Sequence, residues 1–181
     1  MARQFSLNLL GEFVVYRDMN QLALPPSCRR LIALAALKRR PLHRNWVCGT
    51  LWPDSPPNRA VASLRSALWR LRPMGADALL TVRPQDISLA PHVWVDWHEI
   101  IRLADLRAAR GGVADPALKA LLHNGDLLEG WPDRWCASER EHLRELKRDV
   151  LAGMTDSDRR QLPQHGFSRN ILHRVTDPRL Q

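Results

Sequence analysis

The chain has 181 residues, of which 45% are hydrophobic and 25% are charged, a composition typical of a folded globular protein and not of a disordered tail. No apolar run approaches the roughly 18 residues that a membrane-spanning helix needs, and the N-terminus lacks the features of an export signal. The well separated Cys28, Cys48 and Cys136 show no CxxC spacing, which predicts free thiols in a cytoplasmic protein.

The formal net charge of +8 lies entirely in the first half of the chain. Residues 1–95 hold 13 Lys or Arg against 5 Asp or Glu, whereas residues 96–181 hold 14 of each kind. A basic half joined to a neutral half is typical of a polyanion-binding domain joined to a binding or regulatory one. Only 3 of the 27 basic residues are lysine, a bias that GC-rich genomes also produce, so the charge alone is weak evidence.

The N-terminal segment predicts a small antiparallel sheet. Its three β-favouring runs are Phe5–Leu10, Glu12–Tyr16 and Gln21–Leu24, and they are separated by a glycine and by a polar turn. The last run ends at two prolines, Pro25 and Pro26, which cannot continue a sheet.

Two helices come next in the chain. Ser27 is the expected N-cap of a helix over Cys28–Arg39, which ends in basic residues before a proline. Apolar spacing predicts a second helix over Arg44–Trp52, and the proline-rich stretch Pro53–Pro57 is a stiff connector.

The third helix, Asn58–Arg72, is the most distinctive stretch of the sequence. At about 100° per residue, its leucines lie on one face together with Ala60 and Ala67, with Val61 at the edge, and its arginines lie on the other. Asn58 is the expected N-cap, and Pro73 and Gly75 end the helix. Every ionisable residue here is an arginine, which fits either a helix that enters a DNA groove or a solvated helix face.

The segment after this helix favours DNA binding. Two short runs, Ala78–Val82 and Ile87–Leu89, are joined by a four-residue turn that begins with Arg83, and together they predict a β-wing. The order of sheet, two helices, basic helix and wing is that of a winged helix-turn-helix, whose second helix of the pair reads the major groove.

The second half is predicted to be helical after a short linker, Pro91–Val95. The expected helices are Trp97–Arg110, one that starts at Asp115-Pro116, Ala137–Ala152 and Ser168–Thr176, with an aromatic loop over Gly125–Trp135. Helix pairs of this kind stack as helical-hairpin repeats, although no 34-residue periodicity is visible.

No motif for catalysis or metal binding stands out. Glu139 and His142 have the Glu-x-x-His spacing of di-iron bundles, but the second copy that such sites need is missing. A nucleophile elbow, a dinucleotide fingerprint, a phosphate-binding loop and HExxH are also absent. The sequence therefore predicts a non-enzyme without a cofactor or metal.

Four stretches together resemble the Streptomyces antibiotic regulatory protein (SARP) family of transcriptional activators. They are Leu7–Asp18, Leu51–Arg72, Val93–Glu99 and Gly125–Leu151, in order and at normal spacing. The resemblance implies an α+β OmpR/PhoB-type winged helix-turn-helix domain over residues 1–90, followed over 96–181 by an all-α, tetratricopeptide-like bacterial transcriptional activation domain. Family members continue through several more helices, so the resemblance implies a truncated C-terminal domain.

The same resemblance implies a sequence-specific transcriptional activator. Such a protein would bind promoter repeats in double-stranded DNA as tandem protomers, which form a homodimer on DNA. It would recruit RNA polymerase through the loop Trp52–Pro57. Two alternatives stay open at this point. One is a helical-repeat adaptor whose basic half docks proteins, and the other is a truncated DNA binder that no longer activates.

Nine side chains are expected at the DNA interface, and Arg83 is the wing tip that the resemblance implies. They are Arg44, Arg59, Ser63, Arg65, Ser66, Trp69, Arg70, Arg72 and Arg83. An arginine can read guanine or hold a phosphate, and the sequence does not say which does which. Trp69 fits a contact to sugar or to a thymine methyl, but packing against the wing or the second domain is favoured because large aromatics are usually at least half buried.

Overall fold

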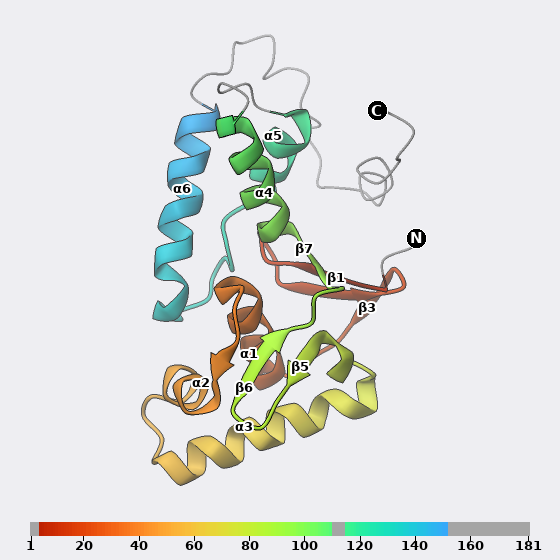
Figure 1. The fold of residues 1–181 in the computed structure, drawn as a ribbon, viewed down its shortest axis with the longest axis vertical. Coiled ribbons are helices and arrows are strands. Elements are labelled where there is room, and N and C mark those ends of the chain that lie inside the picture. The colour runs from red at the N-terminus through yellow and green to blue at the C-terminus, as the bar shows by residue number, and fades with distance from the viewer. Residues whose placement is uncertain (1–3, 110–114, 152–181) are drawn as a thin grey trace.

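The computed structural model describes residues 4–109 and 115–151. The predicted N-terminal sheet is present, with β1 (Phe5–Asn8), β2 (Val14–Arg17) and β3 (Asn20–Leu22) paired antiparallel (Figure 1). A fourth strand, β7 (Trp94–Val95), pairs in parallel with β1, so that the sheet order is β3-β2-β1-β7. The segment predicted as a linker therefore ends as a strand of the N-terminal sheet.

Three helices form the centre and base of the molecule, and they are α1 (Pro26–Lys38), α2 (Arg44–Leu51) and α3 (Pro57–Leu71). The predicted caps Ser27 and Asn58 are wrong, because α1 and α3 each begin on a proline and have no side-chain cap. Proline suits the first helical position, since its fixed φ is helical and its missing N–H would have had no intrahelical partner.

The predicted wing is confirmed and extended. Strands β5 (Leu80–Val82) and β6 (Asp86–Leu89) are antiparallel, and the N–H of Arg83 donates to the carbonyl oxygen of Asp86 at 2.9 Å to close the turn. A two-residue strand, β4 (Leu42–His43), pairs with the other edge of β6. This strand joins the wing to the start of α2.

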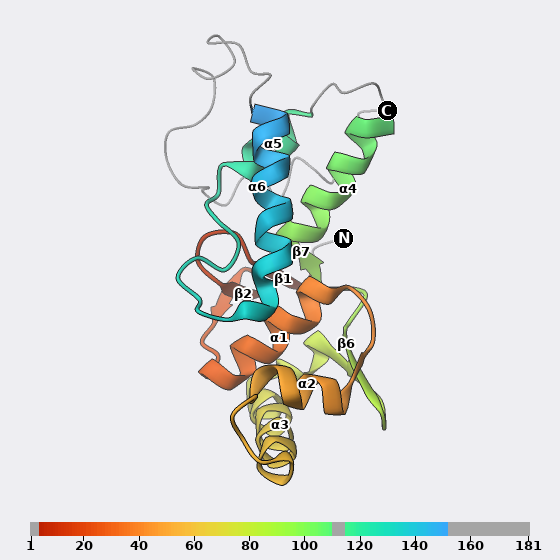
Figure 2. The same ribbon diagram turned by 90° about the vertical axis from the view of Figure 1, so that its left-hand side faces the viewer.

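The described part of the second half is helical as predicted, with α4 (Asp96–Ala109), α5 (Pro116–Leu122) and α6 (Ala137–Leu151) (Figure 2). The Asp115 carboxylate caps α5 by accepting from the N–H of Ala117 at 2.6 Å. Single 3-10 turns lie at Arg72–Met74, Asp77–Leu79 and Arg134–Cys136. The predicted helix Ser168–Thr176 lies outside the described residues. None of the described helices is long and apolar enough to cross a membrane.

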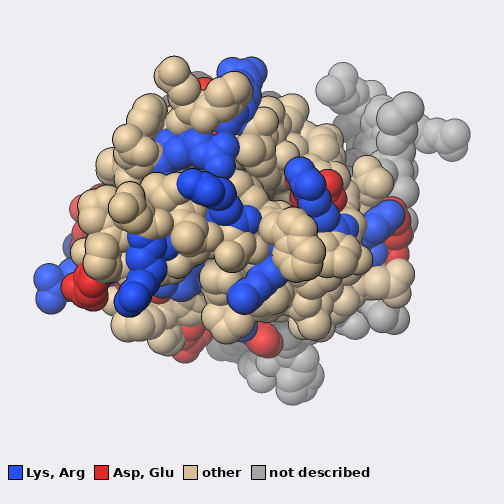
Figure 3. Space-filling view, turned by 90° about the horizontal axis from the view of Figure 1, so that it is seen from below, with Lys and Arg blue, Asp and Glu red and all other residues tan. Residues whose placement is uncertain are grey.

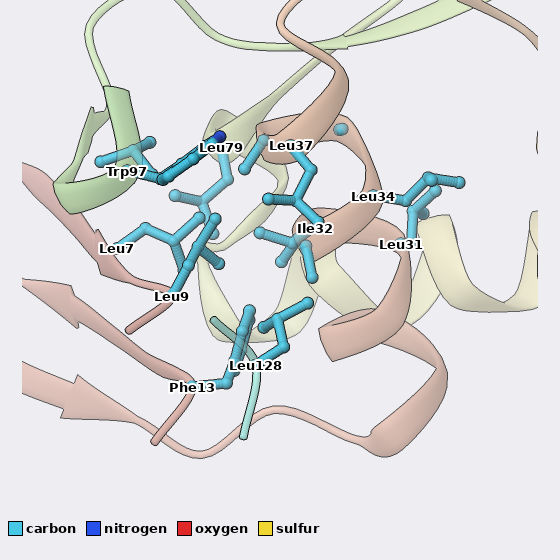
Figure 4. Close-up of a cluster of buried hydrophobic side chains, with 14 of the residues drawn as sticks. Leu7, Leu9, Phe13, Leu31, Ile32, Leu34, Leu37, Leu79, Trp97 and Leu128 are labelled. Atoms are coloured by element: carbon cyan, nitrogen blue, oxygen red, sulfur yellow. The ribbon is translucent and has the colours of Figure 1, made fainter. Parts of the chain in front are cut away.

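A single hydrophobic cluster runs through both halves (Figure 4). It joins Leu7 and Leu9 near β1 and Ile32 of α1 to Trp97 of α4 and Leu128 of the aromatic loop. All three cysteines are buried and free, as predicted, and burial raises the pKa of each thiol. Because the core is shared, burial of apolar surface stabilises the two halves together. The division at residues 90–96 stays a prediction.

Backbone pairing joins the end of β1 to the aromatic loop. Leu10 and Leu127 form an antiparallel bridge, and the N–H of Gly11 donates to the carbonyl oxygen of Asp126 at 2.7 Å. Gly11 has a φ of +67°, and a Cβ there would lie 2.7 Å from the carbonyl oxygen of Asn124. Only glycine fits this contact without a shift of the backbone.

The buried carboxylate of Asp96 joins the same region to α4. It accepts hydrogen bonds from the N–H groups of Leu9 at 2.9 Å, Leu10 at 3.0 Å and Trp97 at 2.7 Å. Burial raises the pKa of Asp96 to about 6, although the three amides oppose that rise by stabilising the charged form. The start of α4 is thereby fixed to the N-terminal sheet.

Helix α1 contacts the helical half with polar side chains while its other side packs on α3. Arg30 pairs with Asp133 at 2.6 Å, and Lys38 with Glu139 at 2.8 Å. The ring Nε2 of His98 is 2.7 Å from the carbonyl oxygen of Ala36, and burial lowers the pKa of His98. Helix α1 therefore lies between the helical half and α3.

Candidate nucleic-acid interface

The amphipathic division of α3 predicted from the sequence is confirmed. Ala60, Leu64, Ala67 and Leu71 are buried against the core, while Leu68 and Val61 are only partly buried at the edge of that face. The Cys28 thiol donates to the carbonyl oxygen of Ala67 at 3.3 Å and so joins α1 to the middle of α3. The opposite side of α3 faces solvent at one end of the molecule (Figure 1).

The structure brings the nine predicted interface residues to α3, the wing and the start of α2. Exposed among them are Arg59, Arg65, Ser66, Trp69, Arg70, Arg72 and Arg83, while Ser63 and Arg44 are half-buried. Seen from the side of α3, Lys and Arg side chains are spread over this face and most Asp and Glu lie near its rim (Figure 3). We call this surface, with its six arginines, the arginine face.

Four arginines form two rows along the flanks of α3. Arg65 and Arg72, the latter in the 3-10 turn that directly follows α3, lie about two turns apart on the flank toward the wing, and Arg59 and Arg70 lie about three turns apart on the other. Between the rows runs a central strip of Ala62, Ser66 and Trp69, which carries no charge. The two cationic rows lie where a duplex that received α3 in its major groove would present its phosphates.

An open groove of about 560 Å³ separates α3 from the wing. Its cations are Arg44, Arg65 and Arg72, its apolar lining is Leu68, Trp69, Leu71, Leu80 and Val82, and Asp77 is its one acidic residue. Alternating phosphate and deoxyribose groups along a DNA strand present a similar mixture of anionic and apolar surface. The groove therefore has the chemistry needed to hold a sugar-phosphate backbone.

Arg44 links the groove to the wing tip. Its backbone N–H donates to the carbonyl oxygen of Gln85 at 2.9 Å, and its Nη1 donates to the carbonyl oxygen of Arg83 at 3.3 Å. These bonds hold the turn of the wing against the start of α2. These bonds thus fix the position of Arg83 in the wing turn relative to Arg44 at the start of α2.

No ion pair neutralises the arginine face within residues 4–109 and 115–151. None of its six arginines pairs with a carboxylate there, and α3 itself contains no acidic residue. Like charges held close together repel, so the face is stabilised by any polyanion that covers it.

Trp69 does not pack against the wing or the helical half, so the packing interpretation is wrong. Its side chain is 66% exposed, and the ring contacts found in the described part of the chain do not involve it. The wheel geometry explains this, because Trp69 lies almost opposite the buried face of α3, beside the open groove. Across the groove, Val82 is also exposed, at 47%.

Val82 is an exposed apolar residue of this surface that the sequence did not single out. Val82 is an apolar residue at the last position before the wing turn, and this was its only signal in the sequence. Such residues are also common in buried strands. The shared groove depends on the packing of α2, α3 and the wing, and no local pattern encodes it.

The residues considered for metal binding have other partners. Glu139 pairs with Lys38, and the ring of His142 packs edge-on against Trp97 with 5.6 Å between ring centroids. No group of three or more His, Cys, Asp or Glu side chains in the described part of the chain is arranged to hold a metal ion.

Comparison with known proteins identifies the fold. No protein-family model matches the chain, and no curated protein matches it. Among solved structures the chain is similar to Mycobacterium tuberculosis EmbR in complex with a low-affinity phosphopeptide, with a TM-score of 0.58 and 21% sequence identity. The match covers 83% of this chain and 44% of EmbR, so the chain spans less than half of that protein. The likeness shows that the chain shares its fold with the matched part of EmbR, and the observed sheets and helices are compatible with a winged helix followed by a helical domain.

Proposed function

We propose that the chain is a sequence-specific DNA-binding transcriptional regulator. Helix α3 enters the major groove of double-stranded DNA, α2 crosses the backbone beside it, and Arg83 at the wing tip contacts the next stretch of the duplex. The mode is that of helix-turn-helix proteins, in which the second helix of the pair reads the base edges.

The unpaired arginine face carries this proposal. Each of its six arginines can contact a phosphate, and together they flank a helix whose buried side is fully packed. Cations of this kind supply most of the affinity for DNA, because binding releases the counterions condensed on the phosphates. The sequence resemblance to SARP proteins and the fold shared with EmbR support this assignment.

The finer role we propose is that of an activator. The protein binds promoter repeats as tandem protomers, and the loop between α2 and α3, Trp52–Pro57, faces RNA polymerase. Residues 1–90 act as the OmpR/PhoB-type DNA-binding domain and residues 96–181 as the bacterial transcriptional activation domain. The sequence resemblance supports these assignments.

The direct test is selection of DNA by the full 181-residue chain. A library of random duplexes is bound and amplified over several rounds, and the enriched duplex is compared with a shuffled duplex in a mobility-shift assay. We expect sequence-dependent binding that weakens with salt. Binding that shows neither property would contradict the proposal and favour the protein-interaction adaptor.

Single substitutions then test the assignment of α3. Arg65→Ala or Arg70→Ala is expected to cost about 1–3 kcal/mol and to relax specificity if the lost contact is to a base. Loss of a phosphate contact should weaken binding to all duplexes alike. It should also reduce the slope of log K against log salt by about one unit. Arg144→Ala, on the exposed side of α6, is the matched control and should change neither. Unchanged binding in both α3 variants would contradict the role of this helix.

A further inference from the structure

Trp69 is an exposed aromatic side chain that the fold itself does not use. At 66% exposure it is the most solvent-exposed of the large hydrophobic residues in the described part of the chain. Exposed indole surface is unfavourable in water, and an exposed apolar residue within a functional surface usually contacts a partner. The surroundings of Trp69 therefore indicate what that partner is.

The central strip of α3 has little hydrogen-bonding chemistry. Ala62 and Ser66 are small and lie on the same side of the helix as Trp69, about two turns and one turn before it. Small side chains allow the helix backbone to come close to the floor of a groove. Ala62 offers no polar atom, and the Ser66 hydroxyl bonds to any base, so neither distinguishes base pairs strongly.

The arginines around Trp69 fix its position over the bases. Arg65 and Arg72 lie one turn to either side of it on the wing flank, and Arg70 lies on the opposite flank. If the flanking arginines hold phosphates on both walls of the major groove, the strip between them faces the base edges. The indole then reaches furthest toward those edges, at the C-terminal half of the helix.

The base edge that matches an apolar side chain in the major groove is the 5-methyl group of thymine. Guanine, cytosine and adenine carry no methyl group there, whereas the thymine methyl adds a larger apolar surface. Trp69 and the exposed Val82 both line the groove between α3 and the wing, so two apolar side chains border this position. A polar base edge under the carbon face of the indole would lose its water and could bond only to the single ring N–H, which disfavours the other bases.

We propose that Trp69 is a specificity-determining residue that recognises a thymine 5-methyl group in the major groove. This inference rests on the proposed DNA binding and adds to it the type of base that is read. The preferred duplex accordingly carries a thymine at one fixed position under the C-terminal half of α3.

Replacement of thymine by deoxyuridine tests this contact, because it removes the methyl group and leaves base pairing intact. The probe is the duplex enriched by the full chain from a random library, with each dT replaced by dU in turn. For the unmodified protein we expect one position at which dU weakens binding about fourfold, the value for removal of one buried methyl group. For Trp69→Ala the same dU substitution should have no effect, while Trp69→Phe should keep most of the discrimination.

Trp46→Ala is the matched control, because Trp46 is another exposed tryptophan, 41% accessible, on α2 instead of α3. This variant should keep the full sensitivity to dU. Equal circular-dichroism spectra and thermal midpoints should show that all three variants are folded, as expected for exposed side chains.

Two outcomes separate the inference from the proposal that it rests on. If no duplex is enriched, the proposed function itself fails. If a duplex is enriched but no position is sensitive to dU, or if dU affects the unmodified protein and Trp69→Ala alike, DNA binding stands and the reading of thymine by Trp69 is overturned. Trp69 would then be free to contact a protein partner.

Discussion

The cations of the helical half and those of the arginine face differ in whether a carboxylate pairs with them. In the helical half, Arg102 pairs with Glu99, Arg144 with Glu141, and Lys147 with Asp126. On the arginine face, in the described residues, no arginine has a carboxylate partner. A polyanion stabilises cations that are already paired only a little. When a polyanion binds to unpaired arginines, it relieves their mutual repulsion. The difference therefore points to α3 and the wing as the binding surface and to the helical half as a charge-balanced scaffold.

A carboxylate placed on the arginine face should have the largest effect on DNA binding, because it gives these arginines the partner that they lack. In Ser66→Glu the new side chain lies one turn before Arg70 and can pair with it, which should leave stability unchanged or raise it by about 0.3–0.5 kcal/mol. In the DNA complex the same carboxylate would face phosphates and bases, so affinity should fall more than about a hundredfold. Mobility shifts and chemical denaturation measure the two effects, and Ser66→Gln is the uncharged control. Weaker folding together with unchanged DNA binding would contradict this prediction.

Removal of the Asp96 carboxylate tests whether the two halves are held as one unit. Asp96→Ala leaves three buried N–H groups without an acceptor, those of Leu9, Leu10 and Trp97. We expect the free energy of unfolding to fall by about 3 kcal/mol or more, because each lost acceptor costs about 1–3 kcal/mol. Chemical denaturation of the full chain measures this, and a loss below about 1 kcal/mol would mean that water replaces the carboxylate.

The pH dependence of stability offers a second test of Asp96. Its pKa in the folded chain is about 6, raised from 3.8 by burial, so the folded chain retains a proton that the unfolded chain loses between these values. The contribution of Asp96 to stability is therefore greatest below about pH 4 and is lost as the pH rises through about 6. The difference in unfolding free energy between the unmodified chain and Asp96→Asn should follow this curve. A flat difference from pH 4 to pH 7 would contradict the raised pKa.

The ion pair between α1 and the aromatic loop should show a smaller effect. Asp133 is 10% exposed and accepts from Arg30 at 2.6 Å and from the indole N–H of Trp135 at 2.9 Å. Asp133→Ala leaves both donors without their partner, and we expect a loss of about 2 kcal/mol in denaturation experiments. DNA affinity should not change, since none of these groups lies on the arginine face. A parallel loss of DNA binding would show that the packing of α1 controls the position of α3.

The smallest effect is expected on the exposed side of α6. The Glu141–Arg144 pair has side chains that are 52% and 58% exposed, and such pairs contribute about 0.5 kcal/mol or less. Glu141→Ala should therefore leave both the thermal midpoint and DNA binding almost unchanged. A change of more than about 1 kcal/mol would indicate that this pair belongs to a larger network.

The elements that the sequence predicted well are those with a strong local pattern. Helix α3 has a clear apolar face between prolines, and the wing has two β-favouring runs around a polar turn, so both lie within two residues of the predicted bounds. Strands β4 and β7 are two residues long and exist only through their partners β6 and β1, which no local pattern specifies.

The candidate site was predicted in part, for the same reason. The charges of α3 can be assigned to one face from spacing alone, and the structure places them there. Whether Trp69 is covered depends on elements distant in the sequence, and the general tendency of tryptophan to be buried led to the wrong interpretation. Val82 and the groove arise from the packing of the wing on α2 and α3, and Asp96 is buried only because β7 joins the N-terminal sheet.

The salt dependence of DNA binding tests whether the arginine face binds DNA while the paired cations of the helical half do not. With the enriched duplex, the unmodified chain should show a slope of log K against log salt of about −5 if all six arginines contact phosphates. Arg65→Ala combined with Arg70→Ala should reduce the magnitude of that slope by about two units, whereas Arg102→Ala combined with Arg144→Ala should leave it unchanged. Equal slopes for the two double variants would contradict the account, because the arginine face would then contribute no more to DNA binding than the paired cations of the helical half.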